Sequence, residues 1–212
     1  MNTLKIIGRS KPVFYFDFNN KRAQIRSAIE GSSILVIGAA GSIGSAVTRL
    51  LHDLNPSKLY VIDLSENNLV ELVRSIRSSS NNKEVDFRTF VIDVGATLFD
   101  RFILDMQPFD YVLNLSALKH VRSEKDIYSM LRMIEVNVFN SIKVQNLCLK
   151  TKIKKYFCVS TDKAANPANM MGATKLLMES ALNANKDITK LSYARFANVA
   201  FSDGSLLFGL DK

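Results

Sequence analysis

Short apolar runs alternate with segments of helical periodicity along most of this 212-residue chain, and this alternation limits the fold more than any other feature. The apolar runs have the length and continuity of strands that are buried on both faces. Strands that alternate with helices form a parallel sheet through right-handed crossovers, with helices on both sides. The sequence therefore predicts a doubly wound, Rossmann-like α/β domain. The predicted strands are residues 34–37, 59–62, 87–92, 111–115, 155–159 and 191–196, and the predicted helices are residues 42–54, 66–78, 97–105, 127–149 and 169–183.

The first 31 residues lie outside this alternation and are predicted to form an N-terminal arm with one short helical stretch near residues 21–30. Residues 32–212 then form a single domain that contains every predicted strand. A chain of this length fits one ordinary domain with an extra arm, so a second large domain is not expected.

Composition indicates a folded chain with a basic balance. Hydrophobic residues make up 47% of the chain and charged residues 23%, which is enough apolar material for a buried core. Lysine and arginine exceed aspartate and glutamate by 28 to 20, and a basic balance favours anionic partners. Because the basic residues are scattered, we expect phosphorylated small molecules as partners and no nucleic acid.

Three further features indicate a cytoplasmic protein without a membrane span. No apolar run reaches the roughly 18 residues that would cross a bilayer. The start of the chain does not resemble a signal peptide. Cys148 and Cys158 have the spacing of neither a zinc site nor a disulfide framework, so we expect no metal and a reducing compartment.

A glycine string, GAAGSIG, lies between the first predicted strand and the first predicted helix. At this point a helix N-terminus can offer backbone N–H groups to a pyrophosphate. Gly38 permits the turn, Gly41 lets phosphates approach the backbone, and Gly44 lets the helix pack on the strand. Ser42 and Ile43 begin the helix and complete the predicted cofactor loop. The alternative is a glycine-rich turn without a ligand, whereas the missing Walker lysine excludes a P-loop ATPase.

Two aspartates follow the next two predicted strands. Asp63 comes about 20 residues after the glycine string, where dinucleotide folds place the carboxylate that binds the adenosine ribose. A carboxylate there repels a 2′-phosphate, so NAD is favoured over NADP. The alternative is that Asp63 or Ser65 caps the next helix, with Glu66 in its first turn. Asp93, after the third predicted strand, could reach the adenine amino group or could be a turn residue.

Four segments together resemble the extended short-chain dehydrogenase/reductase superfamily: GAAGSIG, NLSALKHV at residues 114–121, VSTDKAANPANMMGATK at residues 159–175 and ARFANVAFSDGSLL at residues 194–207. Within that superfamily they are similar to the nucleotide-sugar 4,6-dehydratases that act on UDP-N-acetylglucosamine in bacterial polysaccharide and sialic-acid-like sugar synthesis. The resemblance covers about residues 32–208. ALKHV and STDKAANP are specific to this branch, whereas the whole superfamily shares the glycine loop.

The resemblance implies a dehydration with no net redox change. NAD oxidises the sugar hydroxyl at carbon 4, a base removes the hydrogen at carbon 5, and an acid protonates the departing hydroxyl at carbon 6. The stored hydride then returns to carbon 6. Asp162 matches the acid of the family and Lys163 matches the base. A lysine acts as a base only if its pKa falls, which burial or a nearby cation such as Lys175 could cause. The alternative is a solvated Asp-Lys pair at a strand end.

The usual triad of hydroxyl, tyrosine and lysine in the superfamily maps onto Thr161, Met171 and Lys175. Met171 and Lys175 lie on one helix face, but a thioether cannot take a proton at neutral pH. Long 4,6-dehydratases also carry methionine here, so the change does not imply a dead enzyme. The carbon-4 proton then goes to Thr161, to Asp162 or to water, and Thr161 is our first choice. Lys175 would bind the nicotinamide ribose, or it is an exposed helix lysine.

The resemblance also implies further contacts with cofactor and substrate. Ser116 and Ala117 pass their backbone close to the nicotinamide half of the cofactor. Asn137 holds the active-site region in family members, although it could simply be a polar core residue.

Substrate contacts are expected from three residues at the positions that match the family, Lys119, Arg195 and Asn198. An arginine suits a diphosphate, and the expected partner is a UDP-sugar. We also expect a homo-oligomer.

Two rival functions remain open, a nucleotide-sugar epimerase or reductase on the same fold and a non-catalytic dinucleotide-binding protein. The epimerase would not need the Asp162–Lys163 pair, and the missing tyrosine favours the binding protein. Extended family members continue past the sixth strand into a substrate-binding region, for which this sequence shows no counterpart. From residues 1–212 alone we therefore expect cofactor binding with little sugar turnover.

Overall fold

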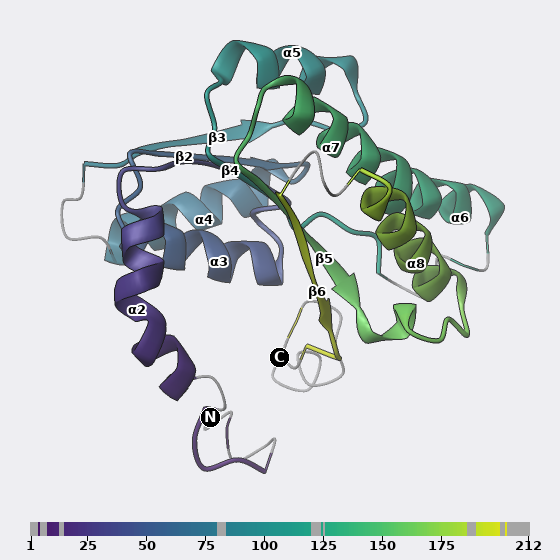
Figure 1. Ribbon diagram of the computed structural model, residues 1–212, viewed down its shortest axis with the longest axis horizontal. Coiled ribbons are helices and arrows are strands. Elements are labelled where there is room, and N and C mark those ends of the chain that lie inside the picture. The colour runs from purple at the N-terminus through teal and green to yellow at the C-terminus, as the bar shows by residue number, and fades with distance from the viewer. Residues whose placement is uncertain are drawn as a thin grey trace.

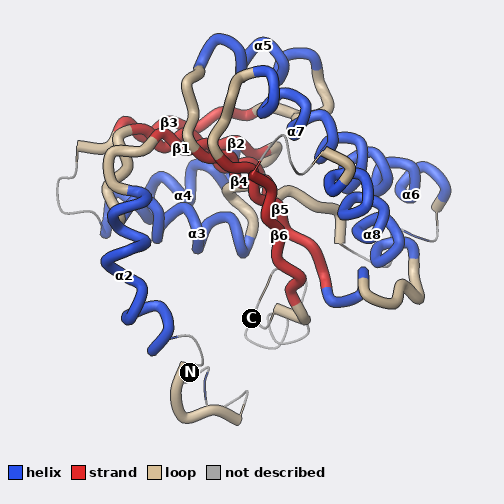
Figure 2. The backbone as a smooth tube through the Cα atoms, viewed as in Figure 1, coloured by secondary structure: helices blue, strands red, loops and turns tan. Residues whose placement is uncertain are grey.

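The computed structural model describes residues 15–79, 84–119, 126–185 and 190–199, together with residues 4, 8–12, 124 and 202. Its centre is a six-stranded parallel sheet in the order β3-β2-β1-β4-β5-β6, which confirms the doubly wound prediction (Figures 1 and 2). The strands are β1 (Ser33–Ile37), β2 (Lys58–Asp63), β3 (Asp86–Val91), β4 (Tyr111–Asn114), β5 (Lys155–Thr161) and β6 (Lys190–Phe196). The helices are α2 (Tyr15–Ile29), α3 (Ser42–Asp53), α4 (Glu66–Ser79), α5 (Thr97–Met106), α6 (Ile127–Ile134), α7 (Asn140–Lys150) and α8 (Met170–Asn183).

Alternate residues of the central strands build two separate cores, one on each face of the sheet. Leu35 and Ile37 of β1 point into the core that α5, α7 and α8 cover, whereas Ile34 and Val36 point into the core under α3 and α4. All four side chains are at most 1% exposed. The strands therefore read as continuous apolar runs because both faces are buried.

The N-terminal arm contains a longer helix than predicted. Helix α2 begins at Tyr15, whereas the sequence suggested a helical start near residue 21. None of its residues is buried, and Figure 1 shows it extending away from the sheet. Aromatic and asparagine residues with low helix propensity occupy residues 15–20, which explains why the first turns were not predicted.

The predicted helix over residues 127–149 is interrupted. Helices α6 and α7 are joined by a π-helical segment, Glu135–Phe139, which widens the backbone for one turn. Asn137 and Val138 of this segment are buried. The hydrophobic spacing continues through the segment, so periodicity alone could not reveal the interruption.

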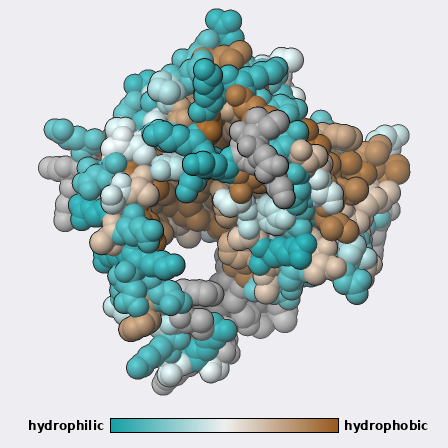
Figure 3. Space-filling model, in the orientation of Figure 1, coloured by the Kyte–Doolittle hydropathy of each residue, from teal (hydrophilic) through white to brown (hydrophobic). Residues whose placement is uncertain are grey.

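Hydrophobic residues gather on the surface over α6 and α8, on the right side of the molecule in Figure 3. We call this the α6–α8 apolar surface. The exposed side chains there are Ile127, Tyr128 and Leu131 of α6, Phe139, and Leu176 and Leu177 of α8. Within the described ranges, no helix is both long enough and apolar enough to cross a lipid bilayer.

Candidate cofactor and catalytic site

The glycine loop between β1 and α3 has its shape because two of its glycines have no side chain. Gly38 has a φ of +74°, and a Cβ there would lie 2.6 Å from a backbone nitrogen of the loop after β4. A Cβ on Gly44 would collide with the carbonyl oxygen of Gly38. Gly41 caps α3 without a side-chain hydrogen bond. Ser42 and Ile43 therefore begin a helix whose N-terminus has no side-chain cap, a favourable position for a phosphate.

Asp63 connects the end of β2 to the glycine loop. Its Oδ2 accepts a hydrogen bond from the Ala40 N–H at 2.9 Å, and its Oδ1 accepts one from the Ser65 N–H at 3.0 Å. The contact with Ser65 lies just before α4 and corresponds to the alternative role of Asp63, which is to cap that helix. Each carboxylate oxygen keeps a second lone pair, so a ribose hydroxyl can still donate to Asp63. Ribose binding stays a prediction.

A cavity of about 330 Å³ opens where β1, β2, β3 and β4 end, a size within the range of ligand pockets. It lies at the point where the strand order reverses between β1 and β4, which is where doubly wound sheets bind ligands. The cavity brings together six of the predicted cofactor residues: Gly38, Gly41, Asp63, Asp93, Ser116 and Ala117.

Three polar residues that the sequence reasoning missed also line this cavity, namely Asn68, Arg132 and Asn140. Arg132 is the only charged residue in the run YSMLRMI, so a cation on an otherwise apolar stretch was the available signal. Asn68 and Asn140 carried no comparable signal, because asparagines are common on helix surfaces.

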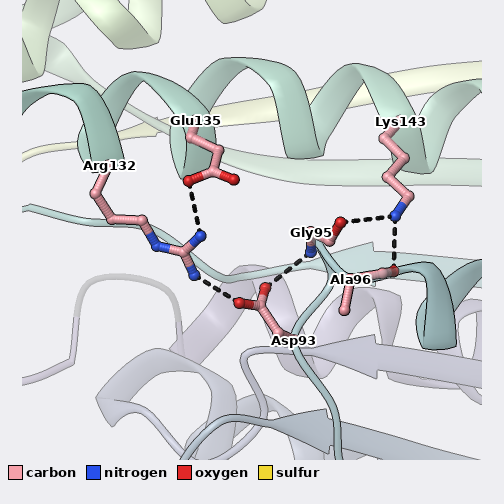
Figure 4. Close-up of polar contacts among 6 residues, drawn as sticks. All are labelled: Asp93, Gly95, Ala96, Arg132, Glu135 and Lys143. Atoms are coloured by element: carbon pink, nitrogen blue, oxygen red, sulfur yellow. Dashed lines mark hydrogen bonds and ion pairs between the residues drawn. The ribbon is translucent and has the colours of Figure 1, made fainter.

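Asp93 is the centre of a polar cluster at one end of the cavity (Figure 4). Its Oδ1 accepts a hydrogen bond from the Gly95 N–H at 2.8 Å, and its Oδ2 accepts one from Arg132 Nη2 at 2.7 Å. Arg132 Nη1 also donates to Glu135, and Lys143 donates to the Gly95 carbonyl. Burial by itself would raise the pKa of Asp93, but the Gly95 and Arg132 contacts outweigh burial and hold this pKa below its ordinary value.

Two buried asparagines shape the loop after β4, which forms another wall of the cavity. Asn114 accepts hydrogen bonds from the N–H and hydroxyl of Ser116, at 3.2 and 2.7 Å. Asn137 accepts from the Leu118 N–H at 3.0 Å and donates to the Leu118 carbonyl at 2.9 Å. Asn137 also donates to Thr174 of α8, so the π-helical segment connects this loop to α8.

The predicted catalytic block forms a connected group at the end of β5. Thr161 Oγ1 donates to Asp162 Oδ1 at 3.0 Å, and Lys163 Nζ donates to the same oxygen at 3.3 Å. Lys163 Nζ also donates to Asn198 Oδ1 at 3.0 Å, so Asn198 lies in this group. The hydrogen bond from Thr161 and the Lys163 charge hold the pKa of Asp162 below its ordinary value. Asp162 is therefore a carboxylate at neutral pH.

Lys175 and Met171 lie on the inner face of α8, and neither lines the cavity. Lys175 is 4% exposed, and its Nζ donates to the Val159 carbonyl of β5 at 2.9 Å. Burial lowers its pKa to about 8, partly offset by the acidic groups of Cys158 and Glu179 nearby. Lys175 is thus a core residue in this structure, not an exposed helix lysine.

The predicted substrate residues do not all lie together. Arg195 of β6 donates through Nε and Nη2 to the Glu179 carboxylate, at 3.0 and 2.6 Å. Lys119 is exposed and does not line the cavity. Residues 120 and 121 of the NLSALKHV segment, and residues 200, 201 and 203–212, lie outside the described residues.

The parallel sheet, the glycine loop and the cavity at the strand ends define a class, the extended short-chain dehydrogenases/reductases. Within it, the family described as "Polysaccharide biosynthesis protein" matches residues 34–209, and the chain belongs to this family.

Two curated relatives are similar over most of the chain. One is the "Uncharacterized membrane protein MJ1061" of Methanocaldococcus jannaschii, which is 35% identical over 86% of this chain and 54% of the relative. The other is the "UDP-N-acetylglucosamine 4,6-dehydratase (inverting)" of Campylobacter jejuni, which is 31% identical over 84% of this chain and 52% of the relative. The chain thus spans about half the length of these relatives.

Two solved structures share the fold. Pen from Bacillus thuringiensis is 28% identical, with a TM-score of 0.72 over 84% of this chain and 54% of that chain. The UDP-glucuronic acid 4-epimerase from Bacillus cereus, solved in complex with NAD, is 20% identical, with a TM-score of 0.65 over 79% of this chain and 56% of that chain.

Proposed function

We propose that this chain supplies the cofactor site and the proton-transfer residues of a nucleotide-sugar 4,6-dehydratase that acts on UDP-N-acetylglucosamine and forms a 4-keto-6-deoxy sugar. The observation that carries the proposal is the connected group of Thr161, Asp162 and Lys163 at the end of β5. Elimination requires an acid and a base side by side, whereas epimerisation at carbon 4 does not. The similarity to the Campylobacter jejuni dehydratase supports the same reaction.

The cofactor proposed for the cavity is NAD. The uncapped N-terminus of α3 at Gly41 suits the pyrophosphate, and Asp63 suits the ribose hydroxyls. Ser116 and Ala117 would lie near the nicotinamide half. What a bound NAD contributes is reversible storage of a hydride. The Bacillus cereus epimerase of the same fold was solved with NAD, which supports this choice.

The residues of this chain would divide the proton transfers among them. Thr161 would receive the proton of the carbon-4 hydroxyl while its own hydroxyl proton passes along its hydrogen bond to Asp162, because Met171 cannot take a proton. Lys163 would first give up its ammonium proton to solvent and would then remove the hydrogen at carbon 5 as a neutral amine. Asp162 would protonate the departing hydroxyl at carbon 6. Asp162 would act as this acid with the proton that it receives through Thr161, because its contacts with Thr161 and Lys163 otherwise keep it ionised.

Lys175 requires a different role from ribose binding in the described arrangement, because its Nζ is bound to the Val159 carbonyl. A buried cation behind β5 favours negative charge at the strand end, where Asp162 and Thr161 lie. Arg195 would reach a diphosphate only by leaving Glu179. Lys119 is exposed in the loop after β4 and would remain available to a substrate.

Product mass separates the dehydratase from its rivals. The protein is incubated with UDP-N-acetylglucosamine and NAD, and also as a fusion to the C-terminal half of the Campylobacter jejuni dehydratase, with that half alone as control. A dehydratase yields a product lighter by one water, an epimerase yields unchanged mass, and a binding protein yields no new compound. An epimer as the only product would contradict the proposal.

The Lys163→Ala variant tests the base assignment in whichever form is active. Deuterium from the solvent should no longer enter at carbon 5, and elimination should fall by at least about 100-fold, the lower range for loss of a general base. Oxidation at carbon 4 should persist. Lys155→Ala, at an exposed lysine on the same strand, is the matched control. Exchange that persists in the Lys163 variant would remove Lys163 from this role.

A further inference from the structure

Three polar side chains from different elements meet at one end of the otherwise largely apolar cavity. Asp93 follows β3, Arg132 belongs to α6, and Asn140 is the first residue of α7. The neighbouring walls are apolar and include Ile92 and Val136. A cavity with apolar walls and a cluster of polar side chains suits a heteroaromatic base, whose faces are apolar and whose edge carries hydrogen-bonding groups.

Asn140 is the member of this set that has no partner. The residue is 6% exposed and lines the cavity, and within the described part of the chain no hydrogen bond reaches its side-chain amide. The amide packs beside Gly95, because a Cβ on that glycine would lie 3.4 Å from Asn140 Oδ1 and 3.5 Å from Nδ2. Because this amide lines the cavity with its hydrogen-bonding capacity unused, a ligand in the cavity can pair with it without breaking an existing contact.

Asp93, in contrast, is held in one orientation. The Gly95 N–H and Arg132 Nη2 each occupy one of its oxygens, and Arg132 is itself fixed by Glu135 (Figure 4). The Asp93 Oδ1 would lie 3.3 Å from a Cβ on Gly95, the same point that the Asn140 amide approaches. The carboxylate and the amide are therefore neighbours at the same end of the cavity.

This juxtaposition matches the edge of adenine. Adenine presents an amino donor next to ring nitrogens that accept, and an asparagine amide pairs with such an edge through both of its polar atoms. A carboxylate can only accept, so it suits the amino group. We propose that Asn140 is a base-reading residue that pairs with the adenine edge of the cofactor beside Asp93, and that Arg132 is the positioning residue that orients Asp93.

The proposal rests on the proposed NAD site and predicts selectivity at the base. Hypoxanthine carries a carbonyl where adenine carries the amino group, so its acceptor would face the Asp93 carboxylate. The wild-type protein should bind NAD about 10-fold more tightly than nicotinamide hypoxanthine dinucleotide, because one mispaired polar contact costs about 1.4 kcal/mol. Calorimetry with both dinucleotides measures this ratio.

Asn140→Leu is the central variant, because leucine has a similar size and cannot hydrogen-bond. NAD should bind about 3- to 10-fold more weakly, the cost of one lost hydrogen bond, while the hypoxanthine dinucleotide should change less than about 2-fold. Asn183→Leu, at an exposed asparagine of α8 outside the cavity, is the matched control and should leave both affinities unchanged. An unchanged ratio in Asn140→Leu would overturn the proposal.

Folding provides an independent readout without any ligand. Because the Asn140 amide has no partner in the described structure, Asn140→Leu should unfold at the same or higher urea concentration than the wild type. A marked loss of stability would show that the amide is a structural group and would overturn the base-reading role.

Arg132 is tested through the same ratio. Arg132→Gln should bring the two affinities closer together, and Arg132→Lys should restore part of the difference because it keeps a cation beside Asp93. Arg101→Gln, which breaks the exposed Arg101–Asp105 pair on α5, is the matched control. If Arg132→Gln leaves the ratio unchanged, the positioning role is wrong.

The wild-type protein distinguishes failure of this inference from failure of the proposed cofactor site. If it binds neither dinucleotide, the cofactor site is wrong and this inference fails with it. If it binds NAD tightly but without selectivity for the base, this inference alone is overturned.

Discussion

Lys175 places a positive charge in the protein interior, between α8 and β5. Its ammonium group has one backbone acceptor, the Val159 carbonyl, and burial lowers its pKa from 10.5 to about 8. The unfolded chain therefore binds more protons than the folded one between pH 8 and 10.5. Below pH 8 both forms are protonated, and the buried charge destabilises the fold by roughly 3 kcal/mol.

Lys175→Met should therefore raise the free energy of unfolding at pH 7 by about 2 kcal/mol, since an apolar side chain of similar length replaces a buried cation. The gain should shrink as pH rises from 8 toward 10.5, because the wild-type lysine loses its proton in the folded state. Burial also raises the pKa of Cys148 and Cys158 to about 12, which opposes the rise in stability above pH 9. Urea unfolding of the wild type and of Lys175→Met at several pH values separates the contribution of the lysine, because both proteins contain the two cysteines. Lys155→Met, at an exposed site, should show no such pH trend.

Asp63 should decide between the two nicotinamide cofactors. Its carboxylate lies at the cavity wall and would repel the 2′-phosphate of NADP, so we expect NAD to bind more tightly by about 10-fold or more. Asp63→Asn should narrow this gap, because the amide removes the charge. Calorimetry with both cofactors measures it, with Asp105→Asn as a distant control. Equal or reversed affinities in the wild type would contradict the ribose role of Asp63.

At the scale of elements, the π-helical segment between α6 and α7 has a specific consequence for the site. It directs the Asn137 side chain at the backbone of the loop after β4, where the amide pairs with both polar groups of Leu118. The same amide reaches Thr174 of α8. One buried side chain thus connects three elements around the cavity wall.

Asn137→Leu should cost about 1–2 kcal/mol of stability, because it leaves the half-buried N–H and C=O of Leu118 without their side-chain partner. The Leu118 amide should also exchange with solvent much faster than in the wild type, which hydrogen exchange detects at that residue. Asn67→Leu, at an exposed asparagine of α4, should change neither quantity. If the Leu118 amide remained equally protected, the loop would be held by something other than Asn137.

At the scale of the whole molecule, the α6–α8 apolar surface is the feature that the fold leaves uncovered. Tyr128, Leu131 and Leu177 are 78%, 54% and 57% exposed on two neighbouring helices. Patches of this kind mark interaction sites in folded proteins. The homo-oligomer expected from the sequence stays a prediction, and this surface is its best support.

We expect the chain to self-associate through this surface, because burying the exposed apolar side chains removes them from water. The double variant Leu131→Lys with Leu177→Lys should lower the molar mass measured by light scattering to that of one chain. Leu104→Lys, at an exposed leucine of α5, is the control and should leave the mass unchanged. A monomeric wild type would contradict the expected association.

The sequence by itself determined the layers of this protein and the position of its cofactor loop. Strands that are buried on both faces must be continuous apolar runs. The turn at Gly38 and the close backbone approach at Gly44 admit only glycine, so a short stretch of sequence is enough to predict either feature. The tertiary structure decided which side chains from different elements are in contact. Arg132 and Asn140 join Asp93 only because the strand order places α6 and α7 beside the loop after β3, and Arg195 pairs with Glu179 only because β6 lies beside β5 under α8. Such contacts join residues that are far apart in the sequence, so the spacing of residues within one segment cannot predict them.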